Sequence, residues 1–379
     1  MTQDHPVRIL HVVGGMNRGG VETWLMNVLR NIDRERYHMD FLVHTDQPRA
    51  YDDEVRALGS RIIPCLHPDR PLRYARRFTQ VLREYGPYDV VHSHVHHYSG
   101  IPLMLARRAG VPIRIAHSHN DTSRVDRAAG RLRRLYLQTM EGLIRVETTC
   151  GLACSQPAAA ALFGVRWAND QRIQVLHYGI DLTPFRQALA EDRCVVRRQL
   201  GLPDNAIVVG HVGRFAPQKN HRFLIEIFAE ILRHEPRAHL LLVGDGPLRP
   251  QVYAQVCALG LNDHVTFAGL RGDVPRLMVG AMDVFLFPSF YEGLSLVLVE
   301  AQAAGLRCVV SDVIPTEADI VPLLVQRMPL QASASVWADI VVGEASKEPA
   351  DSDRALCIVE QGSFSIRQNL RGLEAVYGR

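Results

Sequence analysis

Short runs of mostly apolar residues alternate with amphipathic segments along the whole chain. Runs such as Val7–Val13 and Ile207–Val212 are typical of strands that are buried on both faces of a parallel sheet. The segments between the runs, such as Val21–Asn31 and His221–His234, indicate helices with one apolar face. This alternation predicts the α/β class, with doubly wound parallel sheets.

The expected strands fall into two series, and a length of 379 residues favours two domains. We expect a first Rossmann-like domain at 1–185, joined by a returning helix at 364–379, and a second at 186–363. Leu182–Leu202 is expected to be a connector, and a cleft between the carboxyl ends of the two sheets would take ligands. The expected strands are Val7–Val13, His38–His44, Val90–His92, Ile113–Ala116, Gly151–Cys154 and Ile173–Leu176, then Ile207–Val212, His239–Val243, Val265–Ala268, Val284–Phe287 and Cys308–Ser311. Further expected helices are Gly100–Ala109, Val297–Ala304 and Phe364–Tyr377.

Composition narrows the class of protein. An apolar content of 47% and a charged content of 22% are ordinary for a globular protein. Residues 1–190 hold 25 Arg and 18 Asp+Glu, giving +7, and the remainder hold 18 Lys+Arg and 22 Asp+Glu, giving −4. A basic first half suits an anionic acceptor or an acidic membrane surface, although a solvated basic face would give the same count.

The chain carries no sign of export or of membrane insertion. The seven cysteines are scattered and odd in number, which indicates reduced thiols. No signal peptide and no apolar stretch of 18 residues is present. We therefore expect a cytoplasmic protein, and nothing in the sequence calls for a nucleic-acid partner.

Candidate anion-binding residues follow the strands of the second series. After Ile207–Val212 come Gly213, Arg214 and Lys219. The glycine lets the backbone approach a ligand, and the two cations can reach phosphate oxygens. A loop with two solvated cations would have the same sequence. Gly244 and the pair Leu270-Arg271 follow the next two strands and are weaker signals.

The segment Pro288–Glu300 is the strongest candidate site. Glu292 lies in the loop after a buried strand, and Glu300 lies about one turn into the next expected helix. Between the two acids, the N–H groups of Gly293, Leu294 and Ser295 would lie at a helix N-terminus, where phosphate groups bind readily. Glu300 stands within an apolar run, where an unpartnered carboxylate is costly. We interpret both carboxylates as acceptors for sugar or ribose hydroxyl groups.

The first half offers glycines and histidines. Gly14–Gly20 opens a helix but lacks the glycine spacing of a nicotinamide-binding turn. Histidines are dense at His92–His97 and at His117 and His119, so metal binding must be weighed. No acid or cysteine completes a ligand pattern beside them, and we expect no metal; a histidine at a strand end that faces the cleft fits better.

Together these motifs resemble glycosyltransferase family 4, which has the GT-B fold, over nearly the whole chain. Among its members, the chain looks most like bacterial exopolysaccharide or capsule glycosyltransferases, on the segments Gly14–Thr23 and Ala116–Asn120. The motifs are Gly-Gly-x-Glu at Gly19–Glu22, Gly-Ile-Asp at Gly179–Asp181, Gly-Arg…Lys at Gly213–Lys219, Gly-Asp-Gly-Pro at Gly244–Pro247 and Glu-x7-Glu at Glu292–Glu300.

The resemblance implies a role for each motif. Arg214 and Lys219 would hold the diphosphate of a nucleotide-sugar donor.

 The N–H groups of Gly293, Leu294 and Ser295 would help to hold that diphosphate. The carboxylate of Glu292 would contact the donor sugar, and Glu300 would contact the ribose. Gly244, Leu270 and Arg271 would flank the base.

The resemblance also assigns residues of the first half and a reaction type. Gly19 and Gly20 would come close to the donor, and the family's strand-end histidine most resembles His119, with His117 as the alternative. Members retain the anomeric configuration and let the departing phosphate deprotonate the acceptor, so no general base, metal or cofactor is expected. The carrier would be UDP and the acceptor a glycan or polyprenyl-linked glycan.

Two further interpretations accompany this one. The Arg-rich region Arg124–Arg145, including Arg131, Arg133 and Arg134, predicts peripheral contact with the inner face of the membrane. A UDP-sugar 2-epimerase-like enzyme or an inactive sugar-nucleotide-binding paralogue is the alternative function, although Arg214, Lys219 and both glutamates are present.

Overall fold

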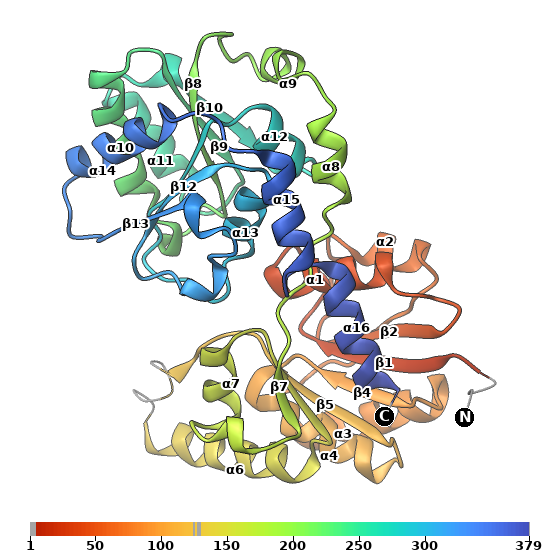
Figure 1. The fold of residues 1–379 in the computed structure, drawn as a ribbon. Helices are drawn as coiled ribbons and strands as arrows, with labels where there is room; N and C mark the ends of the chain where they lie inside the picture. Colours follow the sequence, from red (N-terminus) through yellow and green to blue (C-terminus); the bar gives the residue numbers. More distant parts are fainter. Residues whose placement is uncertain (1–4, 124–125, 127–129, 379) are drawn as a thin grey trace. The chain divides into compact units, whose positions relative to one another are not determined.

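The computed structural model describes residues 5–123, 126 and 130–378. It divides into two compact units, which we describe separately: unit 1 comprises Met1–Ile180 and Ile366–Arg379, and unit 2 comprises Asp181–Ser365. The chain thus leaves unit 1 at Ile180, where the sequence placed the boundary at 185. Figure 1 shows each unit as a sheet with helices packed against it.

Unit 1 contains a seven-stranded parallel sheet with the order β3-β2-β1-β4-β5-β6-β7. Its central strands are apolar because helices cover both faces. The strands are β1 (Val7–Val13), β2 (Tyr37–Val43), β3 (Ile62–Pro64), β4 (Val90–Ser93), β5 (Ile113–Ser118), β6 (Cys150–Ala153) and β7 (Ile173–Val175).

The helices of unit 1 bury large side chains against this sheet. Tyr74 and Phe78 of one helix, for example, are fully buried beside Leu10 and Val12 of β1. Burial of each such side chain contributes about 1.5–3 kcal/mol. The helices are α1 (Gly20–Asn31), α2 (Asp52–Ala57), α3 (Pro71–Tyr85), α4 (Gly100–Arg108), α6 (Arg131–Glu147), α7 (Gln156–Phe163) and α16 (Ile366–Tyr377), with short 3-10 helices at His96–Ser99 and Trp167–Asn169.

Helix α16 comes from the end of the chain and completes unit 1, as the sequence predicts. The backbone N–H of Ile366 donates to the carbonyl oxygen of Ile180 at 3.0 Å. The indole of Trp24 on α1 donates to the side-chain oxygen of Asn369 at 2.9 Å. Both side chains are fully buried, so the bond is part of the unit's core.

Unit 2 contains a six-stranded parallel sheet with the order β10-β9-β8-β11-β12-β13. Leu224 and Phe228 of one helix and Trp337 of another pack in its core. The strands are β8 (Ile207–Val212), β9 (Ala238–Val243), β10 (Val265–Gly269), β11 (Val284–Phe287), β12 (Arg307–Ser311) and β13 (Val325–Met328). The helices are α8 (Thr183–Leu189), α9 (Arg193–Gln199), α10 (His221–His234), α11 (Arg249–Ala258), α12 (Val274–Gly280), α13 (Leu296–Ala303), α14 (Ala334–Ala345) and α15 (Ser352–Gln361), with 3-10 helices at Pro217–Lys219, Asn262–His264, Thr316–Ala318 and Pro322–Leu324.

The predicted α/β class and the doubly wound sheets are confirmed, but the connector is not. Leu182–Leu202 holds two helices, α8 and α9, instead of a plain linker. Phe185 and Val196 of these helices are buried in unit 2, although most other residues of the two helices are polar. The edge strands β3 and β13 were also not predicted, because β3 is only three residues long and β13 has polar residues at its centre.

Each sheet has a point where the strand order reverses. In unit 1 this point lies between β1 and β4, and in unit 2 it lies between β8 and β11. Ligands of open α/β sheets bind outside the carboxyl ends of the strands at such a point. The loops after β8 and β11 are therefore where a ligand of unit 2 is expected.

Candidate functional site

The loops that follow β8 and β11 are held together by hydrogen bonds. The backbone N–H of Phe290 donates to the carbonyl oxygen of Gln218 at 2.9 Å. The side-chain amide of Asn220 donates to the carbonyl oxygen of Pro288 at 3.0 Å. Asn220 itself has a left-handed backbone (φ 54°), which ends the first loop and starts α10. Two segments about 70 residues apart in sequence thus form one rim.

Lys219 and Glu292 meet across this rim. The Nζ atom of Lys219 lies 2.7 Å from Oε1 of Glu292, and the side chains are only 15% and 7% exposed. The amide of Gln218 donates to the other carboxylate oxygen at 3.1 Å. Lys219 also lies over the ring of Phe287, 4.5 Å from its centre. Removing two charges from water is costly, and the ion pair and the added hydrogen bond offset that cost.

Arg214 is the exposed cation of the same rim. Within the described part of the chain, its guanidinium makes no hydrogen bond or ion pair. It follows Gly213, whose N–H donates to the carbonyl oxygen of Val243 at 3.0 Å. The guanidinium is therefore available to an anion from solvent.

The glycines after β8 and β9 let two backbones touch. A Cβ atom on Gly244 would collide with the carbonyl oxygen of Gly213, and Gly244 has φ +135°. The N–H of Gly244 donates to the carbonyl oxygen of Gly269 at 2.8 Å. Only glycine fits such a position, so Gly244 joins the ends of three adjacent strands.

Helix α13 begins at Leu296, with Ser295 as its N-cap residue. Among the described residues, the N–H groups of Gly293, Leu294 and Ser295 donate to no backbone carbonyl. The hydroxyl of Ser295 is buried and also has no hydrogen-bond partner there. Three N–H groups and a hydroxyl at one helix N-terminus can accommodate an anion.

Glu300 lies one turn into α13, as predicted. Burial raises the pKa of its carboxyl to about 7, although the side chain keeps some accessible surface. The carboxyl makes no hydrogen bond or ion pair within the described ranges. A ligand with hydroxyl groups would supply the missing donors.

Leu270 and Arg271 follow β10 at the same edge of the sheet. Leu270 is 62% exposed. The guanidinium of Arg271 forms two hydrogen bonds with the carboxylate of Asp273, at 2.8 and 2.7 Å. Unlike Arg214, Arg271 already has an anionic partner, and the sequence shows that partner two residues later.

The candidate residues of unit 1 lie apart from these loops in the chain and are described by themselves. Gly19 is the N-cap residue of α1, and Gly20 is the first residue of the helix. A Cβ atom on Gly19 would collide with the carboxylate of Glu22, whereas nothing lies near a Cβ atom on Gly20. The glycine at position 19 therefore makes room for Glu22.

His117 and His119 are both buried, at 0% and 6% exposure. Nε2 of His119 lies 2.8 Å from Nδ1 of His94, and its Nδ1 atom is bonded to the hydroxyl of Tyr178. Nδ1 of His117 lies 3.1 Å from Nε2 of His92. Burial keeps these rings neutral, lowering the pKa of His119 to about 3. Both nitrogens of the His119 ring thus already have hydrogen-bond partners inside unit 1.

These histidines belong to a cluster that sequence reasoning did not assemble. His11 on β1 joins it through a 2.9 Å contact between its Nδ1 atom and Nε2 of His94. Two groups of three histidines have ligand atoms within 4.8 Å of one another: His11, His92 and His94, and His94, His117 and His119. His11 escaped notice because it stands 83 positions from His94 and meets it only through the pairing of β1 with β4.

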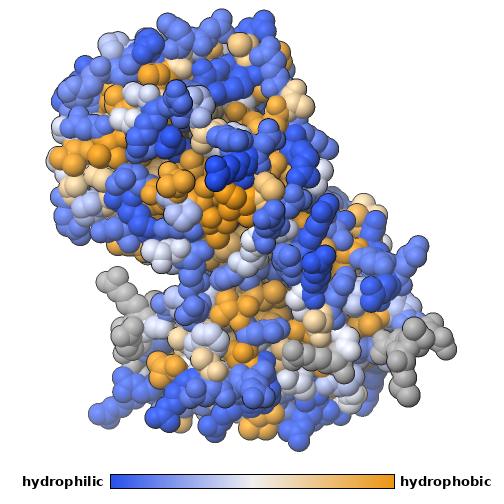
Figure 2. Space-filling view, in the orientation of Figure 1, coloured by the Kyte–Doolittle hydropathy of each residue, from blue (hydrophilic) through white to orange (hydrophobic). Residues whose placement is uncertain are grey.

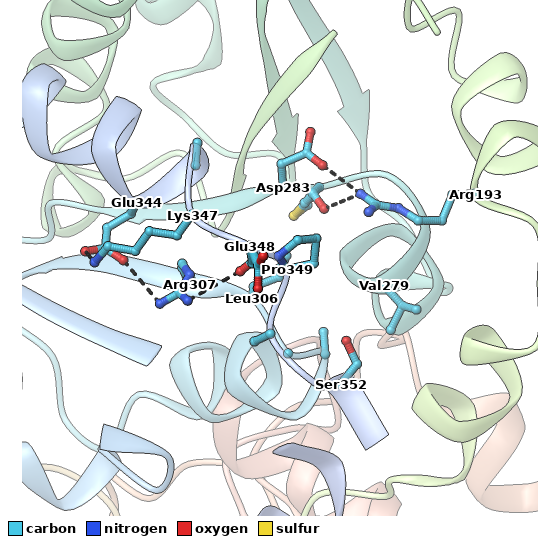
Figure 3. Close-up of a pocket in the computed structure, with 15 residues that line it drawn as sticks. Arg193, Val279, Asp283, Leu306, Arg307, Glu344, Lys347, Glu348, Pro349 and Ser352 are labelled. Carbon is cyan, nitrogen blue, oxygen red and sulfur yellow. Dashed lines mark hydrogen bonds and ion pairs between the residues drawn. The ribbon is translucent and has the colours of Figure 1, made fainter. Parts of the chain in front are cut away.

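Figure 3 shows a separate hollow at the amino-terminal ends of β11 and β12 in unit 2. Its charged groups pair with one another: Arg193 lies 2.8 Å from Asp283, and Arg307 lies 3.5 Å from Glu344. The hollow faces away from the carboxyl ends of the strands, and its neutralised charges give it no evident ligand.

Comparison with known proteins identifies the family. The family described as "Glycosyl transferase 4-like domain" matches residues 19–179, and "Glycosyl transferases group 1" matches residues 206–346. A Bacillus subtilis (strain 168) protein named as glycosyltransferase EpsF is 36% identical over 375 residues, which cover 98% of this chain and 96% of that protein. The chain belongs to glycosyltransferase family 4. The resemblance drawn from its motifs is confirmed.

A more distant relative and a solved structure agree with this family. An Escherichia coli enzyme named UDP-Gal:alpha-D-GlcNAc-diphosphoundecaprenol alpha-1,3-galactosyltransferase is 26% identical over 318 residues, 81% of this chain and 80% of that protein. The crystal structure of Anabaena HepE in complex with UDP is 20% identical, with a TM-score of 0.78 over 98% of this chain and 100% of HepE. This likeness confirms the GT-B fold for this family 4 glycosyltransferase.

Proposed function

We propose that this glycosyltransferase moves a sugar from a UDP-sugar to a glycan or polyprenyl-linked glycan, with retention of the anomeric configuration, in the synthesis of exopolysaccharide or another cell-surface polysaccharide. The observation that carries the donor site is the rim of unit 2. There, Arg214, Lys219 and the N–H groups before α13, which have no backbone acceptor among the described residues, lie at the point where the strand order reverses.

The donor diphosphate would bind at Arg214, Lys219 and the N–H groups of Gly293, Leu294 and Ser295. Lys219 would exchange its bond to Glu292 for one to a phosphate oxygen. The freed carboxylate of Glu292 would then accept hydrogen bonds from the donor sugar. Each exchange replaces one charge-assisted bond by another, so the loops need no new charge.

The remaining residues of the rim would hold the nucleoside. Glu300 would accept hydrogen bonds from the ribose hydroxyls, and Gly244, Leu270 and Arg271 would flank the base. In unit 1, Gly19, Gly20 and His119, with His117 as the alternative, stay candidates for the same reaction. We propose that unit 1 takes the acceptor and unit 2 the donor.

The chemistry follows from where charge develops. As the sugar leaves, negative charge builds on the diphosphate, and preorganised cations and N–H groups stabilise it. The departing phosphate would then accept the proton of the attacking hydroxyl on the same face. This mechanism requires no metal, no cofactor and no general base from the chain.

The named relatives support this choice of substrates. The Escherichia coli enzyme, by its name, uses UDP-Gal, acts on a GlcNAc-diphosphoundecaprenol acceptor and forms an α linkage. HepE was crystallised with UDP and with UDP-glucose. A cytoplasmic location would give the enzyme access to both substrates at the inner face of the membrane.

The acceptor proposal includes peripheral membrane contact through α6. Arg131, Arg133 and Arg134 are exposed on its first turns, together with Leu132 (86% exposed) and Leu135 (63% exposed). In Figure 2, the lower-left part of unit 1 is mostly hydrophilic, with scattered apolar residues. Arginines with apolar side chains between them suit an anionic bilayer surface.

No helix among the described residues has the length and apolar character that crossing a bilayer requires. Arg124, included in the sequence prediction, lies outside the described residues.

Removal of charge tests this contact. Replacement of Arg131, Arg133 and Arg134 by Gln should weaken sedimentation with vesicles that contain an anionic lipid by at least tenfold, and should leave binding to neutral vesicles unchanged. The matched control is the replacement of Arg198, Arg222 and Arg233 of unit 2. Equal binding by both triple variants would exclude α6 as the contact.

The donor site is tested by thermal unfolding with UDP-, GDP- and ADP-sugars, each with and without EDTA. A ligand at 100 times its dissociation constant adds about 2.7 kcal/mol to the free energy of unfolding. We expect a shift with UDP-sugars only, unaffected by EDTA. Lys219→Ala should weaken that binding more than tenfold, or about 1.4 kcal/mol, whereas Arg222→Ala on the exposed face of α10 should not.

Other outcomes would redirect the proposal. A shift with another nucleotide would change the carrier, and no shift with any nucleotide would favour an inactive paralogue. Conversion of a UDP-sugar without acceptor would favour the epimerase. Retention is checked separately, by the anomeric NMR signal of the product formed from an α-linked donor.

A further inference from the structure

Five histidines lie together in the core of unit 1, on its three central strands, β1, β4 and β5, or directly after them. All five side chains are buried, with exposures from 0 to 9%. Their ring centres are 4.2–5.5 Å apart for neighbouring pairs. The histidines are His11, His92, His94, His117 and His119.

We propose that His94, His117 and His119 form a binding site for a first-row transition-metal ion that prefers imidazole nitrogen, with Zn²⁺ as the reference ion. One ring nitrogen of each lies within 4.8 Å of one ring nitrogen of each of the others. Imidazole is a common ligand for zinc, copper and nickel, and three histidines leave a fourth position for water or another ligand.

The hydrogen bonds of the cluster select the nitrogens that would bind the ion. Nε2 of His117 is buried and has no hydrogen-bond partner in the described part of the chain. Nδ1 of His94 and Nε2 of His119 face each other at 2.8 Å. Two nitrogens on one tetrahedral ion are about 3.3 Å apart, so these rings need to separate by roughly half an ångström.

The other nitrogen of each proposed ligand already has a partner. Nε2 of His94 meets Nδ1 of His11 at 2.9 Å, and Nδ1 of His117 meets Nε2 of His92 at 3.1 Å. Nδ1 of His119 meets the hydroxyl of Tyr178. In metal sites, the second ring nitrogen of a ligating histidine donates in just this way, which fixes the ring and its tautomer.

One tautomer assignment satisfies all of these contacts at once. Each ligand donates from its second nitrogen to His11, His92 or Tyr178. His92 then donates from Nδ1 to the hydroxyl of Tyr377, 2.9 Å away. Without an ion, a proton on Nδ1 of His94 or on Nε2 of His119 makes the 2.8 Å contact a hydrogen bond, and the ion would take the place of that proton.

A carboxylate lies near the cluster, because the charge of Glu22 acts on the Tyr178 hydroxyl that bonds to His119. Burial raises the pKa of the Tyr178 hydroxyl, and the neighbouring Cys154 and Glu22 add to the rise. Glu22 is thus a nearby carboxylate that can offset part of the charge of an ion.

This site differs from the donor rim and does not depend on it. Its ligands all belong to unit 1, and the proposed donor contacts at Arg214, Lys219 and Glu292 belong to unit 2. The sequence predicted no metal because no acid or cysteine completes the histidine pattern. The fold replaces those missing ligands with histidines from neighbouring strands.

The test uses the full chain, prepared without a polyhistidine tag, stripped with a chelator and dialysed against Zn²⁺ or Co²⁺. We expect one metal ion per chain by elemental analysis. We also expect the Co²⁺ form to show the strong visible absorption of a four- or five-coordinate ion. His117→Gln and His119→Gln should each weaken Zn²⁺ binding more than tenfold. His239→Gln, which changes a buried histidine of unit 2, should leave binding unchanged.

A second variant guards against simple misfolding. Tyr178→Phe keeps the ring in the core and removes only the hydroxyl that orients His119, so we expect the fold to persist and Zn²⁺ binding to weaken about tenfold. Circular dichroism and UDP binding monitor the fold of the chain and of unit 2. The proposal is overturned if the wild-type chain retains no metal, if its Co²⁺ spectrum is that of the hydrated ion, or if His119→Gln binds Zn²⁺ as tightly as His239→Gln.

Discussion

At the scale of single residues, Glu300 places a carboxyl group in unfavourable, buried surroundings at the proposed donor site. Its carboxyl is buried in α13 without a partner among the described residues, and burial raises its pKa from 4.5 to about 7. Between these two pH values, the unfolded chain releases the proton while the folded chain keeps it. The free energy of unfolding therefore falls as pH rises from about 4.5 to about 7.

Glu300→Gln should remove this dependence. The variant should match the wild type near pH 4.5 and exceed it by about 3 kcal/mol above pH 7, because each unit of pKa shift corresponds to 1.36 kcal/mol. Urea unfolding at several pH values measures the difference between the two proteins, in which other titrating groups cancel. Glu226→Gln, on the exposed face of α10, is the control. Parallel curves for wild type and Glu300→Gln would show that Glu300 is ionised normally.

Single residues also show what the sequence could and could not predict about the site. The apolar neighbours of Glu300 and the glycine before Arg214 marked these positions, and the structure places Glu300 in α13 and Arg214 in the loop after β8. The ion pair of Lys219 with Glu292 could not be predicted, since it joins positions 73 apart. The loop contacts that create the pair appear only when β8 and β11 are adjacent.

At the scale of elements, two helix N-termini of unit 2 differ in a way that suggests different uses. Ser333 caps α14, and its hydroxyl accepts a hydrogen bond from the N–H of Val336. Ser295 caps α13, but its side chain accepts no such bond and is buried without a partner in the described ranges. The hydroxyl of Ser295 therefore does not cap its own helix, and we propose that it binds the donor.

Replacement of each serine by alanine should separate these roles. Ser333→Ala should lower the free energy of unfolding by about 1 kcal/mol, the usual effect of losing an N-cap. Ser295→Ala should change it by less than about 0.5 kcal/mol and should weaken UDP-sugar binding severalfold. Urea unfolding and calorimetric titration give the two values. A stability loss at Ser295 equal to that at Ser333 would mean that Ser295 serves as an ordinary cap.

The bounds of helices and strands were predicted well where the segment has a clear hydrophobic pattern. The expected ranges Val7–Val13, Ile207–Val212, Val284–Phe287 and His221–His234 match β1, β8, β11 and α10. Helices α8 and α9 were missed because they bury only a narrow apolar face, so tertiary contacts decide their structure. The same limit applies to β13, a polar strand at the edge of the sheet.

At the scale of the whole molecule, the histidine cluster and α16 show what two distant ends of a chain can build. The sequence predicted that the last helix returns to the first domain, but not that it would support the histidines. Tyr377 of α16 bonds to His92, and Asn369 bonds both to Trp24 and to the carbonyl oxygen of His177. These contacts link positions up to 345 apart, which no local pattern can reveal.

A chain that ends at Ser365 tests this dependence. The truncation removes the buried side chains of Ile366, Leu373, Val376 and Tyr377 from unit 1, each contributing about 1.5–3 kcal/mol. That sum approaches the whole stability of a typical domain, about 5–15 kcal/mol. We therefore expect hydrogen exchange to show lost protection in β1 and β4 and unchanged protection in β8 and β9. Arg371→Ala, on the exposed face of α16, should protect all four strands as the wild type does. Equal loss of protection in both units would mean that they unfold as one cooperative body, because removal of α16 acts directly only on unit 1.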